Sequence, residues 1–136
     1  MNLDAGSRVK GRKDTISYDL KGGDVICDLN RDWPNKDEAF DKVILNHVLE
    51  HLGHPGHAID EALRSIKKDG VVRIAVPSER CARYKWIDQE ESMSHKWLFK
   101  CYGLRGRFRN YPMFFQKILG MFIPNEYIIE VRRNEA

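Results

Sequence analysis

Several apolar runs in this sequence end in residues that could bind a ligand. Asp19 and Asp28 close two successive runs, Asn46 and His47 follow the next one, and Gly6 follows the first short apolar stretch. If these runs form parallel strands, their carboxyl ends meet at one edge of a sheet, where open α/β sheets bind ligands. A carboxylate at that edge can accept hydrogen bonds from ribose hydroxyls, and a glycine lets the backbone approach a ligand. We therefore expect nucleotide contacts at Asp19 and Asp28; the alternative is that each acid only forms a turn.

The segment from His47 to His51 reads H-x-x-E-H, which is a spacing of zinc peptidases. A catalytic zinc needs a third protein ligand, and no distal acid in the sequence has an obvious helical context. His47 also directly follows an apolar run, so it fits a strand end better than a helix. We therefore predict no metal centre and interpret Glu50 and His51 as helix capping and polar packing. Adventitious metal binding by these histidines, with His54 and His57, is the alternative.

The elements that must position these residues are short strands around one helix. Strands are predicted at residues 15–20, 24–29, 40–45, 71–76 and 127–132, because each run is apolar or alternating and is bounded by turn residues. Three of the runs are almost continuously apolar, which is typical of strands covered on both faces. The gap between the third and fourth runs is long enough for a helix, which predicts a βαβ unit.

That helix is predicted by an apolar stripe at i, i+3, i+4 and i+7 within residues 59–66. Lys67 and Lys68 would then lie in its last turn, and Gly70 would supply a left-handed cap. A shorter helical turn is expected over residues 48–52, and a second helix over residues 113–121.

Five segments, in order, resemble the motifs of class I S-adenosylmethionine-dependent methyltransferases. They are residues 3–7 (LDAGS), 16–20 (ISYDL), 24–29 (DVICDL), 39–52 (AFDKVILNHVLEHL) and 66–77 (IKKDGVVRIAVP). The fourth segment is the closest match, to the small type 11 members. The resemblance implies an α/β fold with a Rossmann-like, mostly parallel sheet, flanking helices and a C-terminal antiparallel strand. It also implies one domain over residues 1–136, trimmed at its N-terminus.

The resemblance further implies that S-adenosylmethionine is the cofactor and that the acceptor of its methyl group is unidentified. Asp19 matches the family's ribose-binding acid, Asp28 its contact to the adenine amino group, and Leu29 its adenine neighbour. His47 matches the methyl-transfer end and is the expected catalytic base if the acceptor must lose a proton. The expected cofactor-binding set is Asp4, Gly6, Asp19, Asp28, Leu29 and Asn46.

Composition indicates the cellular compartment in which the protein works. The chain has 136 residues and a net charge of +3, with no apolar run long enough for a membrane span and no secretory signal, so we expect a cytoplasmic protein. Three cysteines without a CxxC pair fit a reducing compartment. Cys27 is expected to be a small buried residue.

A non-catalytic relative is the alternative function. One glycine of the family's first motif is missing, because either Asp4 or Arg8 occupies its position. Residues 92–125 contain no carboxylate and six lysines or arginines, so this basic C-terminal third could contact nucleic acid or a protein partner. A small sheet with exposed aromatic residues could also form a homo-oligomer.

Overall fold

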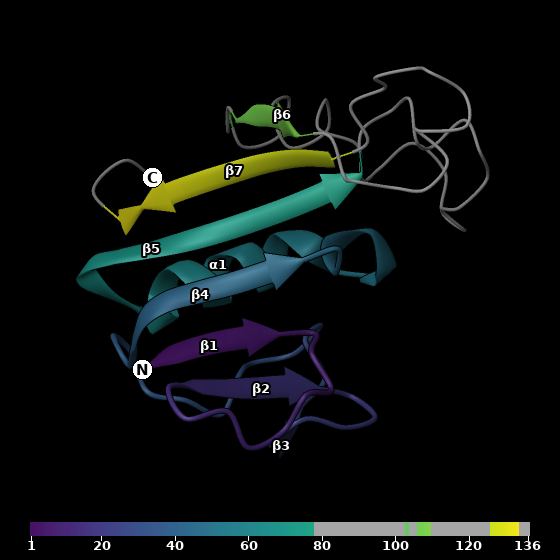
Figure 1. The fold of residues 1–136 in the computed structure, drawn as a ribbon, viewed down its shortest axis with the longest axis vertical. Helices are drawn as coiled ribbons and strands as arrows, with labels where there is room; N and C mark the ends of the chain where they lie inside the picture. Colours follow the sequence, from purple (N-terminus) through teal and green to yellow (C-terminus); the bar gives the residue numbers. More distant parts are fainter. Residues whose placement is uncertain (78–102, 104–105, 110–125, 134–136) are drawn as a thin grey trace.

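A computed structural model describes residues 1–77, 103, 106–109 and 126–133 of the chain. These residues form one seven-stranded sheet with the order β3-β2-β1-β4-β5-β7-β6 (Figure 1). The strands are β1 (Asn2–Ala5), β2 (Thr15–Asp19), β3 (Val25–Ile26), β4 (Phe40–Asn46), β5 (Ile66–Pro77), β6 (Arg107–Arg109) and β7 (Glu126–Arg132). The first five strands are parallel, and β7 runs antiparallel to β5 and β6. The predicted mostly parallel α/β sheet with an antiparallel C-terminal strand is confirmed.

The strand order of the sheet reverses at β1. From β1 the chain adds β2 and β3 on one side and then returns to add β4 and β5 on the other. Such a switch point leaves a crevice outside the carboxyl ends of the central strands. In this sheet the switch point lies next to the ends of β1 and β4.

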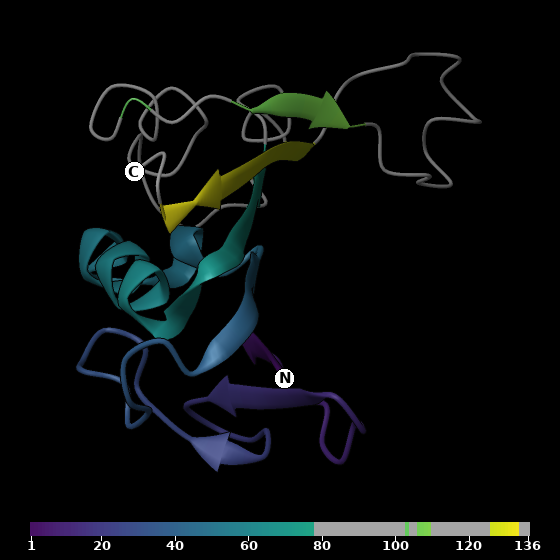
Figure 2. The ribbon, with the colours of Figure 1, turned by 90° about the vertical axis from the view of Figure 1, so that its left-hand side faces the viewer.

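Helix α1 (Pro55–Ser65) connects β4 to β5 and lies on one side of the sheet, against these two strands (Figure 2). Proline suits its first turn because that turn has no partner for a backbone N–H. Ala58, Ile59 and Ala62 are buried, as the apolar stripe predicts, while Leu63 is half-buried against the core.

The predicted end of this helix is wrong. The helix ends at Ser65, and β5 begins at Ile66, so Lys67, Lys68 and Gly70 lie in the strand. Ile66 is fully buried and pairs with Phe40, which draws the chain straight into the sheet. A Cβ at position 70 would lie 2.9 Å from the Cβ of Ile66, so glycine allows a close approach here and does not cap a helix.

One face of the central strands is buried and the other is half-exposed. Leu3, Val43 and Val72 are in register across β1, β4 and β5 and are fully buried. Their neighbours on the other face, Ile44 and Arg73, are partly accessible. The expectation of two covered faces is therefore wrong for these strands, because residues 6–14, which connect β1 to β2, form no helix over the second face.

The remaining elements differ from prediction mainly in length. β3 has two residues, and the turn after β4 is a 3-10 helix, η1 (Leu49–His51). Strand β6 was not predicted, and the helix expected over residues 113–121 lies outside the described residues. Within the described part of the chain, no helix is long and apolar enough to cross a membrane.

Candidate functional site

The candidate site residues lie where β1, β2, β3 and β4 end. Asp19 is the last residue of β2 and Asn46 the last of β4, while Gly6 and Asp28 follow β1 and β3 within two residues. Neighbouring strands are about 4.8 Å apart, so the four strand ends span roughly 14 Å. The topology thus brings Gly6, Asp19, Asp28 and Asn46 to one edge of the sheet, as the sequence predicts, and we call this edge the carboxyl rim.

Gly6 makes the bend that ends β1. Its φ is +90°, and its N–H donates to the carbonyl of Tyr18 at 2.6 Å. A Cβ here would lie 2.1 Å from Cγ2 of Val48, so the bend packs directly against the turn that follows β4. The glycine is therefore required both for backbone conformation and for packing.

Two carboxylates near this bend face arginines from the connection that follows it. Asp19 Oδ1 accepts a hydrogen bond from the Lys21 backbone N–H at 2.8 Å and lies 3.3 Å from Nε of Arg8. Asp4 Oδ2 is 2.8 Å from Nη2 of Arg12. Asp4 lies within β1, two residues before the bend, so the structure places it on the sheet beside Arg12 and not at the rim itself.

Asp28 and Leu29 occupy different environments after β3. Asp28 Oδ1 accepts hydrogen bonds from the backbone and side chain of Asn30, at 3.0 and 3.1 Å, and its carboxylate remains partly accessible. The Leu29 side chain is buried in the core. Cys27 is buried as predicted, and burial, followed by the charges of Asp28 and Glu61, raises the pKa of its thiol to about 11.

His47 lies just past β4 in a left-handed conformation, with φ of +52°. Its N–H donates to the carbonyl of Ala75 at 2.9 Å, which holds the residue at the end of the sheet. Non-glycine residues in this region carry strain that is often found at functional sites. The backbone therefore turns the imidazole out of the β4 pleat beside Asn46, which is exposed.

A buried carboxylate lies next to this imidazole. Glu50 is 3% exposed, and its Oε1 lies 3.6 Å from Nδ1 of His47 and 3.8 Å from Nε2 of His51. Its Oε2 is buried and has no hydrogen-bond partner among the described residues. Because His47 lies before the turn, in a left-handed conformation, and His51 ends a three-residue 3-10 helix, the H-x-x-E-H segment does not form the helical metal pair of a zinc peptidase.

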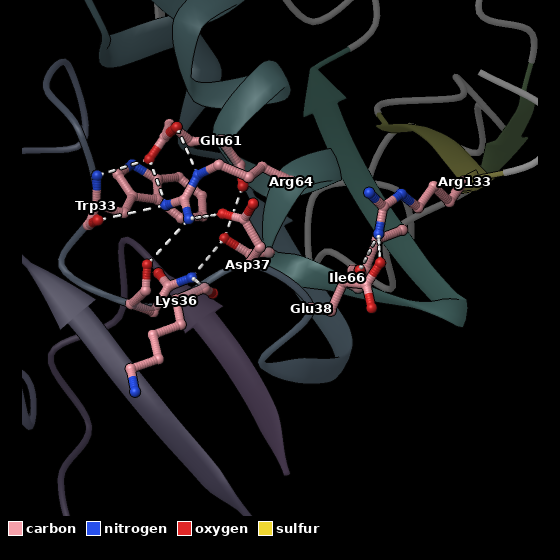
Figure 3. A network of polar contacts seen from close by, with 10 residues as sticks. Trp33, Lys36, Asp37, Glu38, Glu61, Arg64, Ile66 and Arg133 are labelled. Atoms are coloured by element: carbon pink, nitrogen blue, oxygen red, sulfur yellow. Dashed lines mark hydrogen bonds and ion pairs between the residues drawn. The ribbon is translucent and has the colours of Figure 1, made fainter.

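The loop after β3 is fastened to α1 by a network of polar contacts (Figure 3). Glu61 Oε2 accepts from the Trp33 N–H at 2.7 Å, and Arg64 donates to both Glu61 oxygens at 2.9 and 2.8 Å. Arg64 also donates to the carbonyls of Trp33 and Asn35 and to Asp37. Hydrogen bonds from Arg64 lower the pKa of Glu61, and those to Glu61 and Asp37 raise the pKa of Arg64.

The sequence interpretation missed two features of this region. Glu61 lies between the buried Ala58 and Ser65 at helical spacing, so an acid on the apolar face of α1 was a signal for a buried ion pair. Glu50 is buried in polar packing, as interpreted, but its approach to both His47 and His51 was not foreseen, and η1 has no side-chain cap. A surface cleft lined by residues 30–32 and 53–57 adjoins Asp28 but does not include Gly6, Asp19 or His47.

Comparison with known proteins identifies the fold. A putative methyltransferase of Haloferax volcanii, solved in complex with the Trm112 methyltransferase activator, matches 95% of this chain and 80% of its own with a TM-score of 0.66 and 16% identity. A SAM-dependent methyltransferase of Archaeoglobus fulgidus matches 95% of this chain and 84% of its own, with a TM-score of 0.60 and 17% identity. At such identities these likenesses establish the fold alone.

Sequence comparison gives the family. An uncharacterized protein of Methanocaldococcus jannaschii is 39% identical over 56 residues, which are 41% of this chain and only 27% of that relative. A family of proteins described as methyltransferase domains matches residues 9–129. The chain therefore belongs to the methyltransferase domain family and has the class I fold that its motifs resemble.

Proposed function

We propose that this domain binds S-adenosylmethionine across the carboxyl rim and transfers its methyl group to an acceptor. The observation that carries the proposal is the convergence of the Gly6 bend, Asp19 and Asp28 at the switch point of a parallel sheet. Bound S-adenosylmethionine supplies an activated methyl group, so the protein contributes mainly by orienting the two reactants.

The residues at the rim fit such a ligand chemically. Asp19 is an acceptor at a strand end, and its contact to Arg8 is with a side chain that is itself well exposed, so the arginine can move aside. Asp28 keeps part of its carboxylate accessible next to the cleft. We assign Asp19 to the ribose hydroxyls and Asp28 to the amino group of the base.

His47 is the proposed base when the acceptor must lose a proton. Neutral imidazole suits this role near pH 7, and the Glu50 carboxylate at 3.6 Å stabilises the positive charge that the ring acquires. The contact is longer than a hydrogen bond, so Glu50 acts here through its charge and through its effect on the orientation of the ring.

The first test measures ligand binding without knowledge of the acceptor. S-adenosylhomocysteine at about 100 times its Kd stabilises a single-site protein by about 2.7 kcal/mol, which for a chain of this size raises Tm by roughly 9 °C. Asp19→Ala removes a charge-assisted acceptor worth about 1.5–3 kcal/mol, so calorimetric titration should show roughly 10- to 100-fold weaker binding.

Asp60→Ala is the matched control, because Asp60 is an exposed carboxylate on α1, away from the rim. Its affinity should equal that of the wild type. Equal affinity in Asp19→Ala removes Asp19 from the site, and the absence of any thermal shift with either S-adenosylmethionine or its product contradicts the proposed function.

A second candidate function is that of a subunit that works with a protein partner. It is favoured by exposed apolar side chains near one edge of the sheet: Ile26 on the edge strand β3 is 65% exposed, and Leu20, just after β2, is 59% exposed. The Haloferax volcanii neighbour is itself in complex with an activator. The basic stretch that suggested nucleic acid lies almost wholly outside the described residues, so that partner remains a proposal from sequence.

Light scattering coupled to gel filtration, together with an RNA-binding assay, distinguishes a second copy of this chain from nucleic acid as the partner. A homo-oligomer that Ile26→Lys dissociates assigns the edge to a second copy of the chain. Binding of RNA that weakens steeply between 50 and 200 mM salt instead favours nucleic acid. A monomer without affinity for RNA leaves no support for either of these partners.

A further inference from the structure

Three side chains that the proposed function does not use meet at the start of α1. Asp32 comes from the loop after β3, and His57 and Glu61 come from α1; one nitrogen or oxygen of each lies within 4.8 Å of the others. His57 and Glu61 are four residues apart, the spacing at which a helix presents two ligands to one metal ion.

The contact between Asp32 and His57 brings two possible ligand atoms close together without forming a hydrogen bond. Nε2 of His57 lies 3.2 Å from Oδ1 of Asp32, yet this nitrogen is buried and has no hydrogen-bond partner among the described residues. Ligand atoms about 2.1 Å from a tetrahedral zinc are roughly 3.4 Å apart. The 3.2 Å between Nε2 and Oδ1 is close to this value. A cation bound between the two atoms would give the buried nitrogen a partner.

Glu61 retains capacity for a third ligand. A carboxylate offers about four lone-pair positions, and the Trp33 N–H and the two nitrogens of Arg64 use three of them. The guanidinium beside it orients the carboxylate in the way that hydrogen bonds commonly orient metal ligands. The cleft formed by residues 30–32 and 53–57 opens on Asp32 and His57 and gives a metal and its waters access.

We propose that Asp32, His57 and Glu61 bind one zinc-class divalent cation, which fastens the loop after β3 to α1. An imidazole with two carboxylates suits zinc or a similar transition metal and not magnesium or calcium, which prefer oxygen ligands alone. With three protein ligands, water completes the coordination. This loop also carries Asp28, which the proposed function assigns to the adenine amino group. The metal therefore also holds that part of the carboxyl rim in place.

The test is calorimetric titration of the full chain with zinc chloride. It uses a Cys81→Ser/Cys101→Ser background, so that thiolates outside the described residues do not compete. One zinc should bind per chain, magnesium should bind far more weakly, and zinc should raise Tm. Asp32→Asn and His57→Ala should each weaken zinc binding by at least about tenfold, because loss of even a neighbour of a ligand costs 10- to 100-fold.

Asp32→Asn is the decisive variant, because the side chain is 95% exposed and its replacement does not disturb the core. His51→Ala removes an exposed histidine outside the cluster and should leave zinc affinity unchanged. Unchanged affinity in Asp32→Asn and His57→Ala, or an equal loss in His51→Ala, overturns the site. Because zinc binding is measured without S-adenosylhomocysteine, this result is independent of the methyltransferase proposal.

Discussion

Replacement of Arg64 by methionine tests whether the polar network in Figure 3 holds the loop after β3 in place. The guanidinium of Arg64 donates five hydrogen bonds, of which two go to the nearly buried Glu61 and two to backbone carbonyls of the loop. Methionine keeps most of the aliphatic stem, so the variant removes the charge and the donors with little loss of packing.

The expected cost follows from these contacts. Each lost carbonyl bond costs about 1 kcal/mol, and Glu61, left as a nearly buried anion with only the Trp33 N–H, costs about 1–3 kcal/mol more. The contact with Asp37 adds little because that carboxylate is exposed. The sum, about 3–5 kcal/mol, agrees with the usual cost of breaking one side of a buried ion pair.

Urea unfolding followed by circular dichroism measures this change, with Arg31→Met as the control. Arg31 is 84% exposed and lies 3.6 Å from its partner, so its replacement should change stability by less than about 0.5 kcal/mol. Adding Glu61→Gln to Arg64→Met should restore part of the loss, because the uncompensated charge is gone. A cost below about 1 kcal/mol for Arg64→Met, or no recovery in the double variant, refutes the argument.

Three further predictions concern the ends of the sheet. Gly6→Ala should cost about 2–4 kcal/mol in urea unfolding, because alanine meets both an unfavourable φ and Val48, and Val48→Ala should recover only the packing part. Hydrogen bonding from Lys67 lowers the pKa of Asp41 to about 2, so Asp41 stabilises the fold above about pH 4 and loses this effect as the pH falls to 2. In Asp41→Asn, Tm should therefore depend less on pH between about pH 4 and pH 2. Asp24→Ala should speed hydrogen exchange of the two backbone amides that Asp24 binds, while amides of α1 stay protected.

The positions of several strands could be predicted because they depend on local pattern, whereas the order of the strands in the sheet was not predicted. Apolar runs bounded by turn residues located β2, β4 and β5, and the family resemblance supplied the antiparallel direction of β7. The end of α1 could not be predicted from local signals, because the pairing of Ile66 with Phe40 outweighs the cap that Gly70 would make. The prediction that both faces of the central strands are buried was also wrong, because the covering of each face depends on which connections between strands form helices.

The positions of the candidate site residues were predicted as far as strand ends determine them. Asp19 and Asn46 end their strands, and Gly6 makes its bend, as their positions in the sequence indicate. The pairing of Glu50 with His47 depends on a 3-10 turn and a left-handed residue, which no periodicity reveals. Glu61 pairs with Arg64 on the same helix, but its contact with the Trp33 N–H is likewise set by a loop that local sequence does not specify.

Two kinds of carboxylate in this domain therefore have different roles. Asp4 and Asp19 face arginines on an accessible connection, and such surface ion pairs are worth little, so a ligand can displace them at small cost. Glu61 is nearly buried, and opening its contact with Arg64 would leave an uncompensated charge. The first kind suits exchange of a bound molecule and the second suits a fixed support. In the proposed function, the ion pairs of Asp4 and Asp19 open when a ligand binds, while the contact between Glu61 and Arg64 keeps the loop after β3 in place.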